Sequence, residues 1–346
     1  MGKDLSIHTG ELDGFEGLHD AVKGSHVEVM QLERGKLRGT LSHVGIGDFS
    51  LSIGAFNVGV RTQRTSADDK LIIGMLLFLV AVGLTLIFGV LKVVNFSHGA
   101  FYMFGAYFAM TAYQLTGSFA LSILAGAAGT AILGLIFERV FMSRVYGRDV
   151  LMQLLVCYAF VLIFDDVVRM IWGPEFKSMG MPAAFQVPPL FIAGGVVPPY
   201  YLLLIGVALA AAAVLGLGLA RSRIGKVIRA AAHNPGMVSA LGINTGLIYG
   251  GVFALGGMLA GLAGALAAPV RSLTPGMGFS VLIESFIVTV IGGMGSIMGS
   301  IITGFALGVI EGLTKFFYPE ASNTVVFVLM VVVLLVKPTG LTGRAA

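Results

Sequence analysis

A long stretch almost free of charge constrains this chain more than any other feature. Between Leu71 and Phe137 the single charged residue is Lys92. Over the whole sequence 12% of the residues are charged and 56% are hydrophobic, with a mean hydropathy of +0.92, whereas a soluble globular domain carries about 25% charged residues. A water-soluble single domain is therefore excluded, and a chain that lies mostly within a lipid bilayer is indicated.

The charged residues divide the chain in two. Residues 1–70 hold 18 of the 40 charged side chains in a sequence of 346 residues. We predict a polar N-terminal extension over residues 1–70 and a transmembrane domain over residues 71–341.

The second part contains nine apolar runs. Most reach the ~20 residues that a helix needs to cross a hydrocarbon core of ~30 Å. The run 281–293 is too short and is followed by a glycine-rich turn, so we interpret it as a half-helix or a re-entrant segment. The prediction is an all-α polytopic membrane protein with about eight or nine transmembrane helices, over residues 71–91, 96–114, 118–137, 151–172, 199–220, 246–268, 281–293, 297–314 and 323–337.

Basic residues in short loops indicate the orientation, because such loops stay in the cytoplasm. The loops 138–150 and 221–245 and the C-terminal tail carry most of the basic residues of the second part, whereas the segments 173–198 and 269–280 carry one each. We therefore place the first three inside and the last two outside. The side of the N-terminus stays open, because basic residues shortly before residue 71 conflict with the side obtained by counting spans.

Polar residues interrupt the apolar region at three places, and the first two are groups of residues. Asn95 and His98 lie between the first two runs, where they either line a pathway, pin a broken helix or cap a helix start. Asp165, Asp166 and Arg169 lie near the outer end of the fourth run, at a spacing that favours a local ion pair over a proton relay.

Glu284 is the third polar feature of the apolar region. It has no basic neighbour within one helical turn, so it needs a partner from another helix or a water-filled cavity. We predict a functional or helix-locking role for this carboxylate.

Glycine spacing predicts close helix packing. Small residues four apart leave a smooth stripe on one helix face, where a second backbone can approach closely. We predict packing roles for the following glycines: Gly257, Gly261, Gly292, Gly293, Gly295, Gly299, Gly304, Gly308 and Gly312.

The loop 221–245 has the pattern of a short helix outside the membrane. Asn234 can cap it, Pro235 suits its first position and Gly242 suits its end. The flanking basic residues favour either docking on a soluble partner or binding to anionic lipid.

Four blocks of the second part are distinctive: residues 83–107 (GLTLIFGVLKVVNFSHGAFYMFGAY), 229–244 (RAAAHNPGMVSALGIN), 256–266 (GGMLAGLAGAL) and 292–300 (GGMGSIMGS). Together they resemble the permease subunits of branched-chain amino acid ATP-binding-cassette (ABC) importers. The resemblance covers about residues 72–341 and implies a bacterial inner-membrane protein that forms the translocation path together with a second permease subunit. It also implies two cytoplasmic ATPase subunits and a periplasmic substrate-binding protein, with no nucleic-acid partner and no enzymatic activity in this chain.

The resemblance also assigns candidate residues. Asn95, His98 and Glu284 would lie near the path, and the loop 229–244 would couple the ATPase to the membrane helices. The predicted coupling residues are Arg229, Ala230, Ala231, Asn234, Pro235, Ala240, Leu241, Gly242 and Asn244. The sequence contains no GxxxxGK[ST] phosphate loop, so ATP is expected on the partner subunits, and no metal or cofactor is predicted in this chain.

Two alternatives stay open, and the substrate is not fixed. A gradient-driven secondary transporter would also use broken helices, and permeases that resemble this one also carry urea and short amides. Residues 26–64 alternate like short strands and faintly resemble the start of the ligand-binding domain of AraC-type regulators. The N-terminal extension is therefore either a fused remnant or a sensor module.

Overall fold

The computed structural model describes residues 5–13, 27–31, 38–46, 49–56, 60–64, 67–188, 190–192 and 195–342. The chain separates into two compact units, residues 1–69 and 70–346.

The described part of the first unit consists of β-strands. Strands β1 (Leu5–Asp13), β3 (Arg38–Ile46) and β4 (Phe49–Phe56) form an antiparallel sheet in the order β1-β3-β4. Strand β2 (Val27–Gln31) pairs in antiparallel fashion with β5 (Val60–Arg64). In the three-stranded sheet the central position of β3 leaves β1 and β4 at the two edges.

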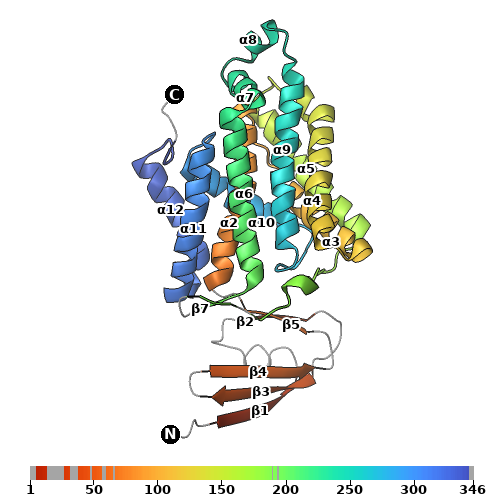
Figure 1. Cartoon of the computed structure of the whole chain (residues 1–346), viewed down its shortest axis with the longest axis vertical. Helices are drawn as coiled ribbons and strands as arrows, with labels where there is room; N and C mark the ends of the chain where they lie inside the picture. Colours follow the sequence, from red (N-terminus) through yellow and green to blue (C-terminus); the bar gives the residue numbers. More distant parts are fainter. Residues whose placement is uncertain are drawn as a thin grey trace. The chain divides into compact units, whose positions relative to one another are not determined.

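The second unit is a bundle of helices (Figure 1). Each of the nine apolar runs coincides with a helix to within a few residues, which confirms an all-α membrane domain. The nine are α2 (Ala67–Leu91), α3 (His98–Thr116), α4 (Phe119–Val140), α5 (Val150–Trp172), α6 (Pro199–Arg221), α9 (Thr245–Ala267), α10 (Met277–Gly292), α11 (Ile297–Phe317) and α12 (Ser322–Val336).

Length and hydropathy place eight of these nine helices in two groups, with α3 in neither. Among the described residues, five helices are long and apolar enough to cross a bilayer, and they are α4, α5, α6, α9 and α11. Shorter apolar helices cover Leu76–Leu91, Met277–Gly292 and Thr324–Val336. Helix α10, for which the sequence predicted a short segment, has 16 residues and begins four residues before the predicted run.

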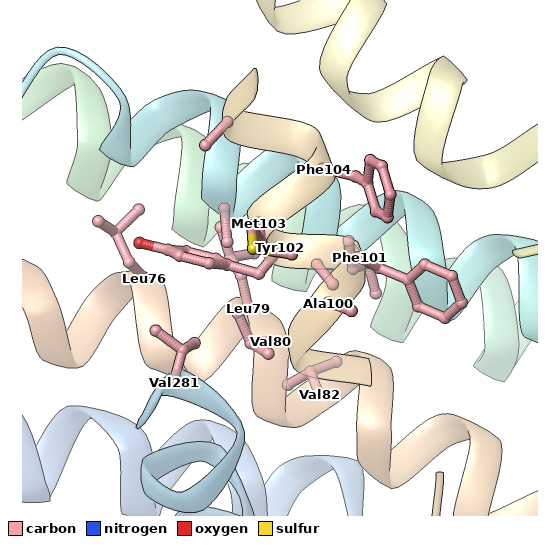
Figure 2. Packing of buried hydrophobic residues seen from close by; sticks show 14 of the residues in the cluster. Leu76, Leu79, Val80, Val82, Ala100, Phe101, Tyr102, Met103, Phe104 and Val281 are labelled. Carbon is pink, nitrogen blue, oxygen red and sulfur yellow. The ribbon is translucent and has the colours of Figure 1, made fainter. Parts of the chain in front are cut away.

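The core of the bundle lies where α2, α3, α9 and α10 meet. Figure 2 shows Leu79 and Val80 of α2 close to Tyr102 of α3, with Val281 of α10 nearby, whereas the Phe101 ring points away from them. Helix α9 is the most enclosed candidate span, with 72% of its apolar window buried, against 17% for α6. The exposed apolar side chains of α4, α5 and α6 are suited to face lipid or another membrane subunit.

Short elements connect the helices, and two of them were not predicted. These two are the hairpin of β6 (Leu190–Ile192) and β7 (Gly195–Val197), and the helix α7 (Arg223–His233) before the predicted α8 (Pro235–Ala240). The remaining connections include the 3-10 turns η1 (Met142–Arg144), η2 (Ala183–Phe185) and η3 (Pro319–Ala321).

Helix α7 has a capped start and one buried face. The Ser222 hydroxyl accepts a hydrogen bond from the Gly225 amide at 2.9 Å, which is an N-cap. Gly225, Ile228 and Ala231 then recur every three residues and are buried. The small size of two of these three residues conceals the amphipathic pattern in the sequence.

Candidate functional site

The break between α2 and α3 is held by buried polar groups. Helix α2 ends at Leu91, and Lys92 adopts a left-handed backbone with a φ of 58°. The Asn95 Oδ1 atom accepts from the Ser97 amide at 3.0 Å, and the Ser97 hydroxyl donates to the Cys157 carbonyl of α5 at 2.8 Å. The His98 Nε2 atom lies 3.1 Å from the Val80 carbonyl of α2. This turn therefore ties three helices together.

Asn95 and His98 are fully buried in this arrangement. Neither residue is the N-cap of α3, because that position belongs to Ser97. The Ser97 side chain makes no capping hydrogen bond. The His98 ring lies against Gly83, where an added Cβ would come within 3.0 Å of Nε2. Among the described residues, Asn95 Nδ2 and His98 Nδ1 have no hydrogen-bond partner. The geometry favours pinning of the helix break, and contact with a substrate stays a prediction.

Glu284 belongs to a cluster of charged and polar side chains from four elements, two of these side chains buried and two half-buried. Arg271, in the connection between α9 and α10, hydrogen-bonds to Tyr102 of α3 and lies close to Glu284 of α10 and Glu311 of α11. Burial alone would lower the pKa of Arg271, but Tyr102 and the two carboxylates raise it above its usual value. The guanidinium is therefore a cation, and it is the basic neighbour that Glu284 lacks within its own helix.

The sequence alone gave no signal for this cluster. Arg271 precedes Glu284 by 13 residues, and the connection between them was interpreted as an ordinary outside loop. The guanidinium of Arg271 comes close to Glu284 of α10 only in the folded chain.

The connection that carries Arg271 is anchored to a second segment. Leu273 and Lys177 exchange two backbone hydrogen bonds, of 2.8 and 2.9 Å. The carboxylate of Asp165 in α5 accepts from the backbone amide of Gly276. These bonds hold the connection at Leu273 and again at Gly276.

The predicted ion pair near the end of α5 involves one of the two aspartates. Arg169 Nη1 lies 3.6 Å from Asp166 Oδ1, and both side chains are exposed. Asp165 instead lies beside Gly276, so the two neighbouring carboxylates have different structural roles.

The loop 229–244 projects a short helix away from the bundle (Figure 1). The Asn234 Oδ1 atom accepts from the Met237 amide at 3.0 Å and caps α8, and Gly242 follows with a φ of 79°. Asn244 caps α9 in the same way, at 3.3 Å from the Leu247 amide. These caps explain why a chain rich in alanine and glycine forms two defined helices here.

The residues of this loop have two kinds of surroundings. Arg229 donates to the Leu219 carbonyl at the end of α6, and Ala231 is buried, so both hold α7 on the bundle. Ala230, Asn234, Pro235, Ala240 and Gly242 are exposed. So are the apolar side chains of Met237 and Leu241, which expose 62% and 73% of their surface. Two exposed apolar groups, one on a short projecting helix and one at its C-cap, are suited to burial against a partner.

A tyrosine cluster lies where α9 leaves this loop. The Tyr146 hydroxyl donates to Glu138 Oε1 at 3.1 Å, and Glu138 Oε2 lies 3.9 Å from Arg139 Nε. Tyr249 packs edge-on against Tyr146, with 5.7 Å between ring centroids. Burial and the nearby Glu138 raise the pKa of Tyr146, so its hydroxyl remains a donor. No sequence pattern predicted this cluster.

Eight of the nine predicted packing glycines lie close to another part of the chain, and the ninth, Gly312, is buried. Gly257 and Gly261 of α9 face α4, Gly304 and Gly308 of α11 face α2, and Gly292 faces Gly299. Gly293 lies beside Gly340, and Gly295 lies beside Gly89. Among the described residues, no group of three or more His, Cys, Asp or Glu side chains could hold a metal ion.

The bundle defines the class of this protein, which is a multi-pass membrane protein with a projecting helical loop. A family model described as the permease component of branched-chain amino acid transport systems matches residues 66–334. The chain belongs to this family of transport permeases, which is not a family of enzymes.

Curated relatives match over most of their length. The high-affinity branched-chain amino acid transport system permease protein BraD of Pseudomonas aeruginosa is 31% identical over 289 residues, which cover 80% of this chain and 94% of the relative. The corresponding protein LivH of Escherichia coli is 29% identical, with 77% and 91% covered. A probable branched-chain amino acid permease of Methanocaldococcus jannaschii is 27% identical, with 81% and 93% covered. No solved structure matches the chain significantly.

The family match begins at residue 66, so it leaves the strands of the first unit outside. The resemblance of residues 26–64 to AraC-type regulators gains no support from it.

Proposed function

We propose that this chain is the permease subunit of an ABC importer that carries branched-chain or closely related amino acids across the bacterial inner membrane. The family match over residues 66–334 is the observation that carries the proposal. The names of the relatives, which are branched-chain amino acid transport permeases, support the substrate class.

The proposed assembly contains a second permease subunit, two cytoplasmic ATPase subunits and a periplasmic substrate-binding protein. Helix α8 docks on an ATPase subunit through Met237 and Leu241, whose exposure supports this role. ATP binds to the partner subunits, and its hydrolysis moves α8 and hence α9, which begins five residues after α8 ends.

The proposed membrane arrangement has eight or nine membrane helices, from α2 to α6 and from α9 to α12. The 16 residues of α10 span about 24 Å, which is less than the ~30 Å core, so α10 is a short element enclosed by its neighbours. The basic loops at α7 and α8 face the cytoplasm, and the connection between α9 and α10 faces outward. Asn95 and His98 hold the α2–α3 break beside the path.

The competing function is a gradient-driven secondary transporter. Such a carrier needs no cytoplasmic ATPase, so a change on α8 would leave its uptake intact. The residues 1–70 are proposed to be a fused remnant that transport does not require.

Copurification tests the proposal. We expect a tagged chain, solubilised in mild detergent, to bring down a Walker-motif ATPase and a second permease. Met237→Glu should lose the ATPase, because a carboxylate on α8 opposes burial of that surface. Leu115→Glu is the matched control, since Leu115 is 80% exposed at the end of α3, away from α8. Recovery of the chain alone, in preparations that still transport, would favour the secondary transporter.

A further inference from the structure

Two members of the Arg271 cluster are only partly enclosed by the protein. Arg271 and Glu284 are half-buried, whereas Tyr102 and Glu311 are buried, with 2% and 8% of their surface exposed. A charged side chain at membrane depth is costly, and it usually marks a pathway or a binding site. The two accessible members carry opposite charges.

Opposite charges held at one place match the head group of a free amino acid. A guanidinium binds a carboxylate through two parallel hydrogen bonds, and a carboxylate binds an ammonium group. An amino acid carries both groups on one carbon atom, so it can insert between Arg271 and Glu284 without adding net charge to the membrane interior. An ion carrying a single charge could pair with only one of these two groups, whereas an amino acid pairs with both.

The position of the cluster fits an entry site. Figure 1 shows α7 and α8 at one end of the bundle and the connection from α9 to α10 at the opposite end of α9. In the proposed orientation this opposite end faces outward, where a binding protein would release its substrate. The Lys177–Leu273 bonds join the connection to the segment 173–188, which would lie on the same side.

We propose that Arg271 and Glu284 form a recognition site for the zwitterionic head group of the transported amino acid. Tyr102 and Glu311 position the guanidinium, and the apolar side chain of the substrate points away from the charges. The proposal rests on the function proposed above and adds the residues of this chain that contact the substrate.

Equilibrium binding of radiolabelled leucine to the purified permease–ATPase complex, without the binding protein, tests this site. We expect saturable binding in at least one of two states, nucleotide-free or held with a non-hydrolysable ATP analogue. Unlabelled leucine should compete, whereas 4-methylpentanoate, which lacks the ammonium group, and 3-methylbutylamine, which lacks the carboxylate, should compete at least tenfold less well.

Variants assign the binding to the cluster. Glu284→Gln and Arg271→Gln should each weaken leucine binding at least tenfold, and Arg271→Lys, which keeps the charge but loses the bidentate geometry, should weaken it less. Asp166→Asn and Arg169→Gln are the matched controls, because they remove the same groups from an exposed ion pair on α5. We expect binding by both controls to equal that of the unmodified complex.

Two outcomes would overturn the site. One is a complex that takes up leucine with its binding protein in proteoliposomes but binds none in either nucleotide state. The other is undiminished leucine binding by the Glu284→Gln and Arg271→Lys variants, which would leave the cluster as a structural lock between helices. A complete complex that takes up no branched-chain amino acid would instead count against the proposed function.

Discussion

At the scale of single residues, the tightest constraints are the places where two helix backbones meet. A Cβ added to Gly264 of α9 would overlap the backbone of Tyr102 in α3, and a Cβ added to Gly99 would overlap the backbone of Gly278 in α10. A backbone carbonyl cannot turn aside as the end of a side chain can. The two helices would have to separate, and the van der Waals contacts that hold membrane helices together would be lost.

Gly264→Ala should therefore lower the stability of the detergent-solubilised protein. Overpacking of this kind typically costs ~1–3 kcal/mol, and the expected result is a clear fall in the temperature at which the protein leaves the monodisperse peak in size-exclusion chromatography. Gly206→Ala on α6 is the matched control, because nothing lies within 4 Å of the added Cβ. That control should be neutral or slightly stabilising, since alanine is the better helix former. Equal melting temperatures for the two variants would contradict the close-contact interpretation.

At the scale of secondary-structure elements, the apolar runs located the helices well, but they did not say which helix is enclosed. Helix α9 has a mean hydropathy of 1.7, the lowest of the four longest candidate spans, yet it is the most buried of them. Helix α6 has a mean hydropathy of 2.6 and is mostly exposed. Lipid is as apolar as a protein core, so hydropathy does not distinguish the two surroundings. The number of glycines does: α9 contains seven, α6 three and α5 none.

Helix α8 is the element on which the coupling prediction depends. Gly242→Pro should uncouple transport, because proline fixes φ near −65° and the chain has a φ of 79° there. Ala240→Glu should do the same by placing a charge on the exposed docking surface. Leucine uptake by the reconstituted importer should fall at least tenfold in both, with normal amounts of the protein in the membrane.

The control for Ala240→Glu is Gln114→Glu, which adds the same charge at an exposed position near the end of α3. Its uptake should be unchanged. Normal uptake by a stably inserted Ala240→Glu variant would show that α8 transmits no movement to the bundle.

At the scale of the whole molecule, charge distribution predicted the division of the chain, but not the partners of its buried charges. The predicted division after residue 70 lies one residue from the observed one, because lipid tolerates few charged side chains and the change in composition is abrupt. The Arg271–Glu284 pair and the Glu138–Tyr146 pair join different elements, and no sequence period connects them. Local spacing predicts caps and turns such as Asn234 and Gly242, whereas contacts between elements depend on how the helices pack.

Deletion of residues 1–65 should leave transport intact. The family match begins at residue 66, so every element of the matched permease is retained. Uptake of leucine in cells that lack their own importer, together with the amount of protein in the membrane, measures the effect. Deletion of residues 1–75 is the control, because it also removes Gly74, which packs against the backbone of Gly308 in α11; this variant should insert poorly. If the shorter deletion abolished uptake while the protein still inserted normally, residues 1–65 would be a working part of the importer, and a sensor module would replace the fused remnant as their interpretation.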